Sequence, residues 1–183
     1  MTHDELCVHA ARWLRTKRRM RIVLRDVRVT VVSEQPDAIG FSSSRSVLVE
    51  CKTSIQDLRR DAQKIFRRDP ARGMGKERWV MMPRALESAA EHVLPDWGIL
   101  LVDERRLSIN IVRRSRFFER NVDAENVLLI SALQRATEGW GRRMFLVDGD
   151  PHPTASKLLA ELREENTRLR HELQALRAPS SKP

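Results

Sequence analysis

The chain is 183 residues long, which fits one compact domain with length to spare and is too short for a two-domain enzyme with a separate cofactor domain. Apolar residues make up 41% and charged residues 32%, so the chain can bury a core. Its 34 Lys and Arg against 25 Asp and Glu give a net charge of +9, which favours a polyanionic partner such as nucleic acid; the alternative is a basic protein without one.

Cysteine content and hydropathy indicate the compartment. Cys7 and Cys51 are the only cysteines, too few for a disulfide framework or a four-thiolate zinc site. The N-terminal residues carry acids and an arginine where a signal peptide would be apolar, and no apolar run is long enough to span a membrane. We therefore expect a soluble cytoplasmic protein with no membrane partner.

The N-terminal half predicts a helix followed by strands. Thr2 and Glu5 form a capping-box pattern before apolar residues at helical spacing, which predicts a helix over residues 2–17. Near-alternating β-branched residues predict one or two strands within 22–32. Two further strands, 38–41 and 46–52, form a hairpin around the polar connection 42–45.

The next part of the chain predicts alternating helices and strands. A capping Thr or Ser and apolar residues at helical spacing predict one helix over 53–68, ended by Pro70. The remaining elements are a loop over 72–78, a strand over 79–82, a helix over 84–93, a hairpin of strands 98–102 and 107–113, and a helix over 123–137. The domain is predicted to occupy residues 1–138, followed by a Gly- and Pro-containing linker over 139–153.

The C-terminal segment has a seven-residue period. Apolar residues and one asparagine fill the a and d positions of three heptads, which predicts a coiled-coil helix over 154–178 before a disordered tail, 179–183. We expect this helix to pair two copies of the chain in parallel; the alternative is a single amphipathic helix folded back on the body. The predicted interface residues are Leu159, Leu162, Asn166, Leu169, Leu173 and Leu176.

The hairpin of residues 38–52 carries the candidate chemistry. If its turn is centred on Ser43 and Ser44, Asp37 faces Glu50 across the strands, and Lys52 lies on the same face. Two close carboxylates repel unless a cation lies between them, and hard oxygen ligands suit Mg²⁺ or Mn²⁺. Such an ion with an adjacent ammonium suits phosphodiester hydrolysis, and Lys52 is one of only 6 lysines beside 28 arginines.

Pro36-Asp37 followed after thirteen residues by Glu50-Cys51-Lys52, between two helices, resembles the PD-(D/E)XK nuclease superfamily, including bacterial and phage members associated with DNA repair. The resemblance covers roughly residues 1–102 and implies an α/β fold: a restriction-endonuclease-like αβββαβ core whose mixed central sheet is flanked by helices. It implies Asp37 and Glu50 as metal ligands, the Cys51 backbone carbonyl as a further ligand, and Lys52 as the catalytic lysine.

The helices on either side of the motif supply further candidates by the same resemblance. Glu5 on the first helix is a candidate for approaching the metal, as is Gln63 or Lys64 on the helix after the motif. Arg67 stands where one branch of the superfamily has a tyrosine.

Basic residues follow the motif directly and predict a phosphate-binding strip beside the metal; the alternative is an ordinary solvated face. They are Arg59, Arg60, Lys64, Arg67, Arg68, Arg72, Lys76 and Arg78.

Taken together, these patterns favour an enzyme: a Mg²⁺-dependent deoxyribonuclease that cuts DNA as a coiled-coil-linked homodimer, with Mn²⁺ as a substitute metal. The alternative is a non-catalytic nucleic-acid-binding or assembly protein that retains the nuclease fold. The sequence has no histidine metal motif, Walker loop or dinucleotide fingerprint, so no organic cofactor is expected.

Overall fold

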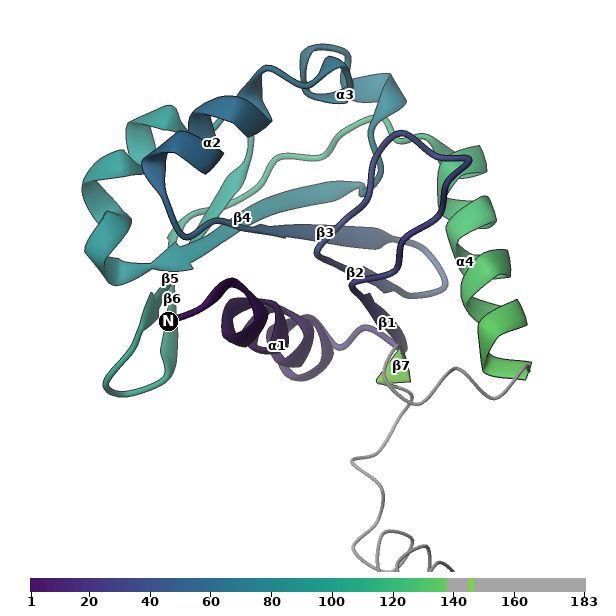
Figure 1. The fold of residues 1–183 in the computed structure, drawn as a ribbon, viewed down its shortest axis with the longest axis horizontal. Helices are drawn as coiled ribbons and strands as arrows, with labels where there is room; N and C mark the ends of the chain where they lie inside the picture. The colour runs from purple at the N-terminus through teal and green to yellow at the C-terminus, as the bar shows by residue number, and fades with distance from the viewer. Residues whose placement is uncertain (138–144, 147–183) are drawn as a thin grey trace, which may run out of the picture. The chain divides into compact units, whose positions relative to one another are not determined.

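A seven-stranded mixed sheet forms the centre of the computed structural model, which describes residues 1–137, 145 and 146 (Figure 1). The strand order is β6-β5-β4-β3-β2-β1-β7. Neighbours β3, β4 and β5 run parallel, and every other pair is antiparallel. The strands are β1 Ile22–Arg25, β2 Ala38–Phe41, β3 Ser46–Cys51, β4 Glu77–Pro83, β5 Gly98–Asp103, β6 Ser108–Arg113 and β7 Phe145–Leu146.

Helices cover both faces of the sheet. Helix α1 lies on one face, whereas α2, α3 and the 3-10 helix η2, which connect the parallel strands, lie on the other (Figure 1). This arrangement confirms the predicted α/β class with a mixed sheet flanked by helices. The helices are α1 His3–Thr16, α2 Ile55–Ala62, α3 Ile65–Arg68, η1 Pro70–Arg72, η2 Arg84–His92 and α4 Val122–Thr137.

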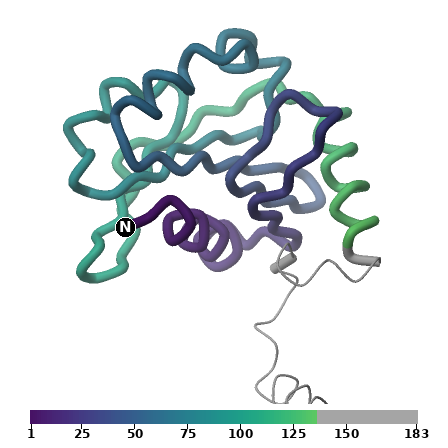
Figure 2. The backbone as a smooth tube through the Cα atoms, in the orientation of Figure 1, coloured from purple at the N-terminus to yellow at the C-terminus, as the bar shows by residue number. Residues whose placement is uncertain are grey.

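Two apolar clusters form the core, one on each face of the sheet. Under α1, Leu6, Ala10 and Leu14 pack with β3 residues such as Val47 and Val49. The second cluster combines sheet residues with apolar side chains of α2, η2 and α4. The long connection from β1 to β2 rises over this second face, as Figure 2 shows, and buries Val27 and Val29 there.

The hairpin and the first helix agree with their predictions. The capping box of Thr2 and Glu5 is present at the start of α1. In the hairpin, Ala38 pairs with Val49 and Ile39 with Leu48, which is the predicted register. Strands β5 and β6 and helix α4 also lie within a residue of their predicted bounds.

Several predicted bounds are wrong. Strand β1 ends at Arg25 rather than continuing to 32, because Asp26 has a φ of 54° and turns the chain away from the sheet. The helix predicted over 53–68 breaks at Lys64, whose extended backbone separates α2 from α3. Strand β4 starts at Glu77 within the predicted loop.

The C-terminal predictions lie mostly outside the described residues. Within the predicted linker 139–153, the two described residues, 145 and 146, form β7, which pairs with β1. The coiled-coil helix 154–178 and the tail 179–183 lie wholly outside the described residues. Among the helices of the described part, none is long and apolar enough to cross a membrane.

Candidate active site

Asp37 and Glu50 meet at the end of the β2-β3 hairpin. The observed register, extended by one residue beyond Ala38 and Val49, sets Asp37 opposite Glu50. The Cys51 backbone N–H donates to Asp37 Oδ2 at 2.7 Å, which anchors this carboxylate to the strand. Burial, and then the negative charge of Glu50, raises the pKa of Asp37 to about 6. A cation between the two carboxylates would relieve this repulsion.

Lys52 completes the predicted group on the same face of β3. Its Nζ donates to Glu50 Oε2 at 3.0 Å and lies 3.4 Å from Asp61 Oδ1. Burial alone lowers the pKa of Lys52, but the charges of Glu50, Asp61 and Asp37 outweigh it and hold the pKa above its usual range. In this arrangement Lys52 therefore carries a positive charge at neutral pH.

Arg67 lies buried at the centre of a network of three carboxylates. Its guanidinium donates to Glu34, lies 3.1 Å from Glu50 Oε1, and donates through Nε to Asp61 Oδ2 at 2.7 Å. The ring of Trp97 lies 4.4 Å from its central carbon, so the cation is also stacked. After the break between α2 and α3, Arg67 is buried and contacts Oε1 of Glu50, the oxygen that Lys52 does not contact.

Glu34 and Asp61 are members of this site that the sequence analysis did not identify. Burial raises the pKa of Glu34, whereas the adjacent Arg67 and Lys52 outweigh burial and lower the pKa of Asp61. Asp61 lies three residues after the buried Leu58 on the inner face of α2, and that helical spacing was the available signal. Nothing in the sequence marked Glu34, which lies in the connection before β2.

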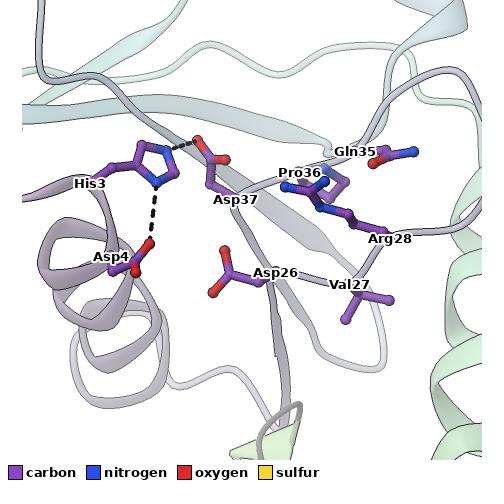
Figure 3. Close-up of a pocket in the computed structure, with 8 residues that line it drawn as sticks. All are labelled: His3, Asp4, Asp26, Val27, Arg28, Gln35, Pro36 and Asp37. Atoms are coloured by element: carbon purple, nitrogen blue, oxygen red, sulfur yellow. Dashed lines mark ion pairs between the residues drawn. The ribbon is translucent and has the colours of Figure 1, made fainter.

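A polar cavity of about 270 Å³ opens beside Asp37 (Figure 3). It lies between the start of α1 and the β1-β2 connection, so Asp37 is the residue of the Asp37, Glu50 and Lys52 group that faces it. Both polar contacts of Asp37 in the described part of the chain are made by Oδ2, which leaves Oδ1 to accept a cation. The lining residues are His3, Asp4, Asp26, Val27, Arg28, Gln35, Pro36 and Asp37.

The residue of α1 that reaches Asp37 is His3 rather than the predicted Glu5. Glu5 is exposed and its Oε2 accepts the Thr2 backbone N–H at 2.8 Å, so the capping box holds it away from the cavity. His3 Nε2 lies 3.5 Å from Asp37 Oδ2 (Figure 3). Glu5 as a residue that approaches the metal stays a prediction, and its capping-box spacing from Thr2 was the signal that it also serves the helix terminus.

Two residues of the predicted phosphate-binding strip are buried and belong to the protein interior. Arg67 forms the network described above. Arg78 donates to backbone carbonyls of the loop before β4, among them Gly73 and Gly75, and burial lowers its pKa to about 10. The other members remain accessible: Arg59, Arg60, Lys64, Arg68 and Arg72 are exposed and Lys76 is half-buried.

Gln63 and Cys51 have limited roles in the observed geometry. Gln63 is exposed at the end of α2, where the chain breaks. The Cys51 side chain is buried in the α1 cluster, and its backbone N–H serves Asp37. The Cys51 carbonyl as a metal ligand stays a prediction.

Comparisons with known proteins find one protein of similar fold and none of known function. No known protein family and no curated protein matches the chain. The structure of the SPO1766 protein of unknown function from Silicibacter pomeroyi is similar, with a TM-score of 0.55 and 18% identity. The similarity covers 75% of this chain and 88% of that chain. It therefore supports the α/β fold alone.

Proposed function

We propose that the protein is a metal-dependent DNA endonuclease with a restriction-endonuclease-like core of the PD-(D/E)XK type. One observation carries the proposal: the β2-β3 register brings Asp37 opposite Glu50, and Lys52 donates to Glu50 from the same face. The element order α1-β1-β2-β3-α2-α3-η1-β4 supports it, since it agrees with the αβββαβ order that the resemblance implies, with the short α3 and η1 added after α2.

The acidic and the basic residues of the site would have different roles. Asp37, through its uncontacted Oδ1, and Glu50 would hold Mg²⁺ or Mn²⁺, hard cations that prefer carboxylate oxygens. When bound, such an ion polarises a phosphodiester and lowers the pKa of its water. Lys52, whose pKa is raised, would offset negative charge that develops on the phosphate. Arg67 would position Glu50 without contacting substrate.

The charge of the body supports DNA as the substrate. Residues 1–153 hold 28 basic and 21 acidic side chains, so most of the excess positive charge lies outside the predicted coil. The accessible residues of the strip, on α2 and after it, follow the site in sequence and could contact phosphates. Pairing through residues 154–178 would place two sites on one duplex.

Cleavage assays with isosteric variants test the proposal. Asp37→Asn, Glu50→Gln and Lys52→Met should each reduce Mg²⁺-dependent cleavage of linear, branched or single-stranded DNA by about a hundredfold or more. Matched controls are Asp57→Asn, which removes a carboxylate paired with Arg60 on α2, and Lys17→Met at the end of α1. Circular dichroism would check that all variants fold. Cleavage that survives Glu50→Gln would reject the site.

A non-catalytic DNA-binding protein with the same fold is the second candidate, and one observation favours it. Both oxygens of Glu50 already have a cationic partner, Oε2 in Lys52 and Oε1 in Arg67, so Glu50 itself is compensated without a metal. This candidate predicts DNA binding that weakens with salt but is the same in Mg²⁺ and in EDTA, with no cleavage in either.

A further inference from the structure

Three side chains of different chemistry converge beside the cavity. His3 and Cys7 lie four residues apart on one face of α1, and Asp37 approaches them from the start of β2. One ligand atom from each, the Cys7 Sγ, a His3 ring nitrogen and an Asp37 carboxylate oxygen, all lie within 4.8 Å of one another. Neither His3 nor Cys7 has a role in the proposed hydrolysis.

The separations of His3 Nε2 from the other two ligand atoms are close to those around a tetrahedral zinc ion. Zn–S bonds of about 2.3 Å and Zn–N or Zn–O bonds of about 2.1 Å imply edges of about 3.6 Å from S to N and about 3.4 Å from N to O. His3 Nε2 lies 3.5 Å from Asp37 Oδ2 and 3.9 Å from Cys7 Sγ, and the sulfur lies 3.5 Å from Nδ1 of the same ring. Since the sulfur and the carboxylate oxygen lie within 4.8 Å of each other, side-chain rotations would bring all three ligands onto one ion.

The donor set selects a different metal from the one that Asp37 and Glu50 would hold. A sulfur and an imidazole nitrogen suit Zn²⁺ and related ions, whereas Mg²⁺ prefers oxygen ligands throughout. Cys7 has no exposed surface, so it is not placed to attack an external substrate and could serve an ion held from within.

Two neighbouring features bear on this cluster. Asp4 lies 3.9 Å from the other ring nitrogen, Nδ1, of His3, too far for a hydrogen bond but close enough to add negative charge beside the ring (Figure 3). His3 and Asp37 both line the cavity, so the fourth position of the ion would open into it. Three protein ligands and one open position are typical of an accessible zinc site rather than a closed structural one.

We infer that His3, Cys7 and Asp37 form a binding site for Zn²⁺ that shares Asp37 with the catalytic metal, so that zinc inhibits the protein. The inhibition rests on the proposed nuclease function, whereas zinc binding does not. Asp37 would offer Oδ2 to zinc and Oδ1 to the catalytic metal, so zinc bound at His3 and Cys7 takes up part of the negative charge of this carboxylate and weakens its hold on Mg²⁺.

Cobalt, a spectroscopic substitute for zinc, tests the site directly on the full chain. In the presence of Mg²⁺, titration with Co²⁺ should give a sulfur-to-cobalt charge-transfer band that saturates at one ion per chain, and Zn²⁺ should remove it. Cys7→Ser should abolish the band, whereas Cys51→Ser, the other buried cysteine, should keep it. Absence of the band in the unmodified protein, or its loss only in Cys51→Ser, would overturn the inference.

A histidine variant covers the case in which Cys7→Ser fails to fold. His3 is half-exposed, so His3→Gln should fold, and its affinity for Co²⁺ should fall about tenfold or more. His9→Gln, on the same helix but outside the cluster, is the matched control and should bind as the unmodified protein does. Equal affinity in the two variants would count against the site.

Zinc titration of the cleavage reaction separates the inference from the proposed function. Zinc should inhibit Mg²⁺-dependent cleavage, and His3→Gln should shift the inhibition to about tenfold higher zinc or more, relative to its own uninhibited rate. A cobalt band without cleavage under any condition would leave the zinc site standing and reject the nuclease. Cleavage with the same zinc sensitivity in both proteins would overturn the shared site.

Discussion

The ionised Asp37 carboxylate destabilises the folded state at the neutral pH where it would bind a metal. Burial and Glu50 raise its pKa from 3.8 to about 6, so the folded state holds a proton that the unfolded state has released between these values. The free energy of unfolding therefore falls as the pH rises from about 4 to about 6, and the whole penalty is present above that. Asn at this position would carry no such penalty and could still accept the Cys51 N–H.

We therefore predict that Asp37→Asn stabilises the protein while it strongly reduces cleavage. Urea denaturation in EDTA at pH 7.5 should show a free energy of unfolding higher by about 1–3 kcal/mol, and the gain should shrink towards zero near pH 4. Destabilisation at pH 7.5, or a gain independent of pH, would contradict the assigned charge environment of Asp37.

Arg67 should have the opposite effect on stability. Its removal leaves Glu34, Glu50 and Asp61 buried without their shared cation, and breaking such a network costs about 3–5 kcal/mol. Arg67→Met should lower the thermal midpoint strongly, whereas Arg68→Met on the exposed surface should change stability by at most about 0.5 kcal/mol. Arg68→Met should instead weaken DNA binding. Equal stability of the two variants would refute the buried network.

The site residues that lie on or next to the strands could be predicted from the sequence, whereas the site residues in helices and connections could not. Strand periodicity and a symmetric turn placed Asp37, Glu50 and Lys52 on one face, because side chains alternate strictly along a strand. Glu34 joins through an irregular connection and Arg67 through a helix break, neither of which has a sequence period. His3 was missed because the family resemblance pointed to Glu5.

Helix α4 is tied to the sheet by one buried carboxylate. Glu125 Oε1 accepts from Ser46 Oγ at 2.6 Å and from the Gly75 N–H at 2.8 Å, while Oε2 accepts from Arg120. Ser46 begins β3 and Gly75 precedes β4, so this one residue joins α4 to both strands.

Glu125→Ala should consequently loosen α4 more than the rest of the fold. Leaving the buried hydroxyl and N–H without their acceptor costs about 2–4 kcal/mol, and hydrogen exchange should accelerate first along α4. Asp123→Ala, an exposed acid in the same first turn, is the control and should cost about 0.5 kcal/mol or less. Uniform acceleration across the sheet would argue against a local tether.

Among the elements, prediction succeeded where local pattern and tertiary packing agree. Helix α1 has one buried face with a clear helical period, and the β2-β3 hairpin consists of two short, largely apolar strands, buried on both faces, around a polar turn. Strand β4 starts earlier than predicted because buried partners allow charged residues in it: Glu77 pairs with Arg18, and Arg78 binds backbone carbonyls. These partners come from other parts of the fold, so the local hydropathy around Glu77 and Arg78 does not indicate them.

For the whole molecule, the predicted coil is the part with a direct consequence for assembly. Deleting residues 154–183 should convert a dimer into a monomer by light scattering, because the a and d residues of all three heptads are removed. The truncated chain should retain its circular dichroism from the sheet and α1. A monomeric mass before truncation would favour a helix folded back on the body, and a dimer after it would place the interface elsewhere.

The charged groups of the buried network and the aromatic ring that covers them come from different parts of the chain. All of its ionic groups come from residues 34–67, and its longest link, from Glu34 to Arg67, closes a loop of 33 residues at small entropic cost. Trp97, which stacks on Arg67, enters only with β5. The charged groups thus come from residues that are close in sequence, whereas the exclusion of water from them depends on a strand that is distant in sequence. Without β5 the same groups would meet in water, where the attractions that define the site are several times weaker.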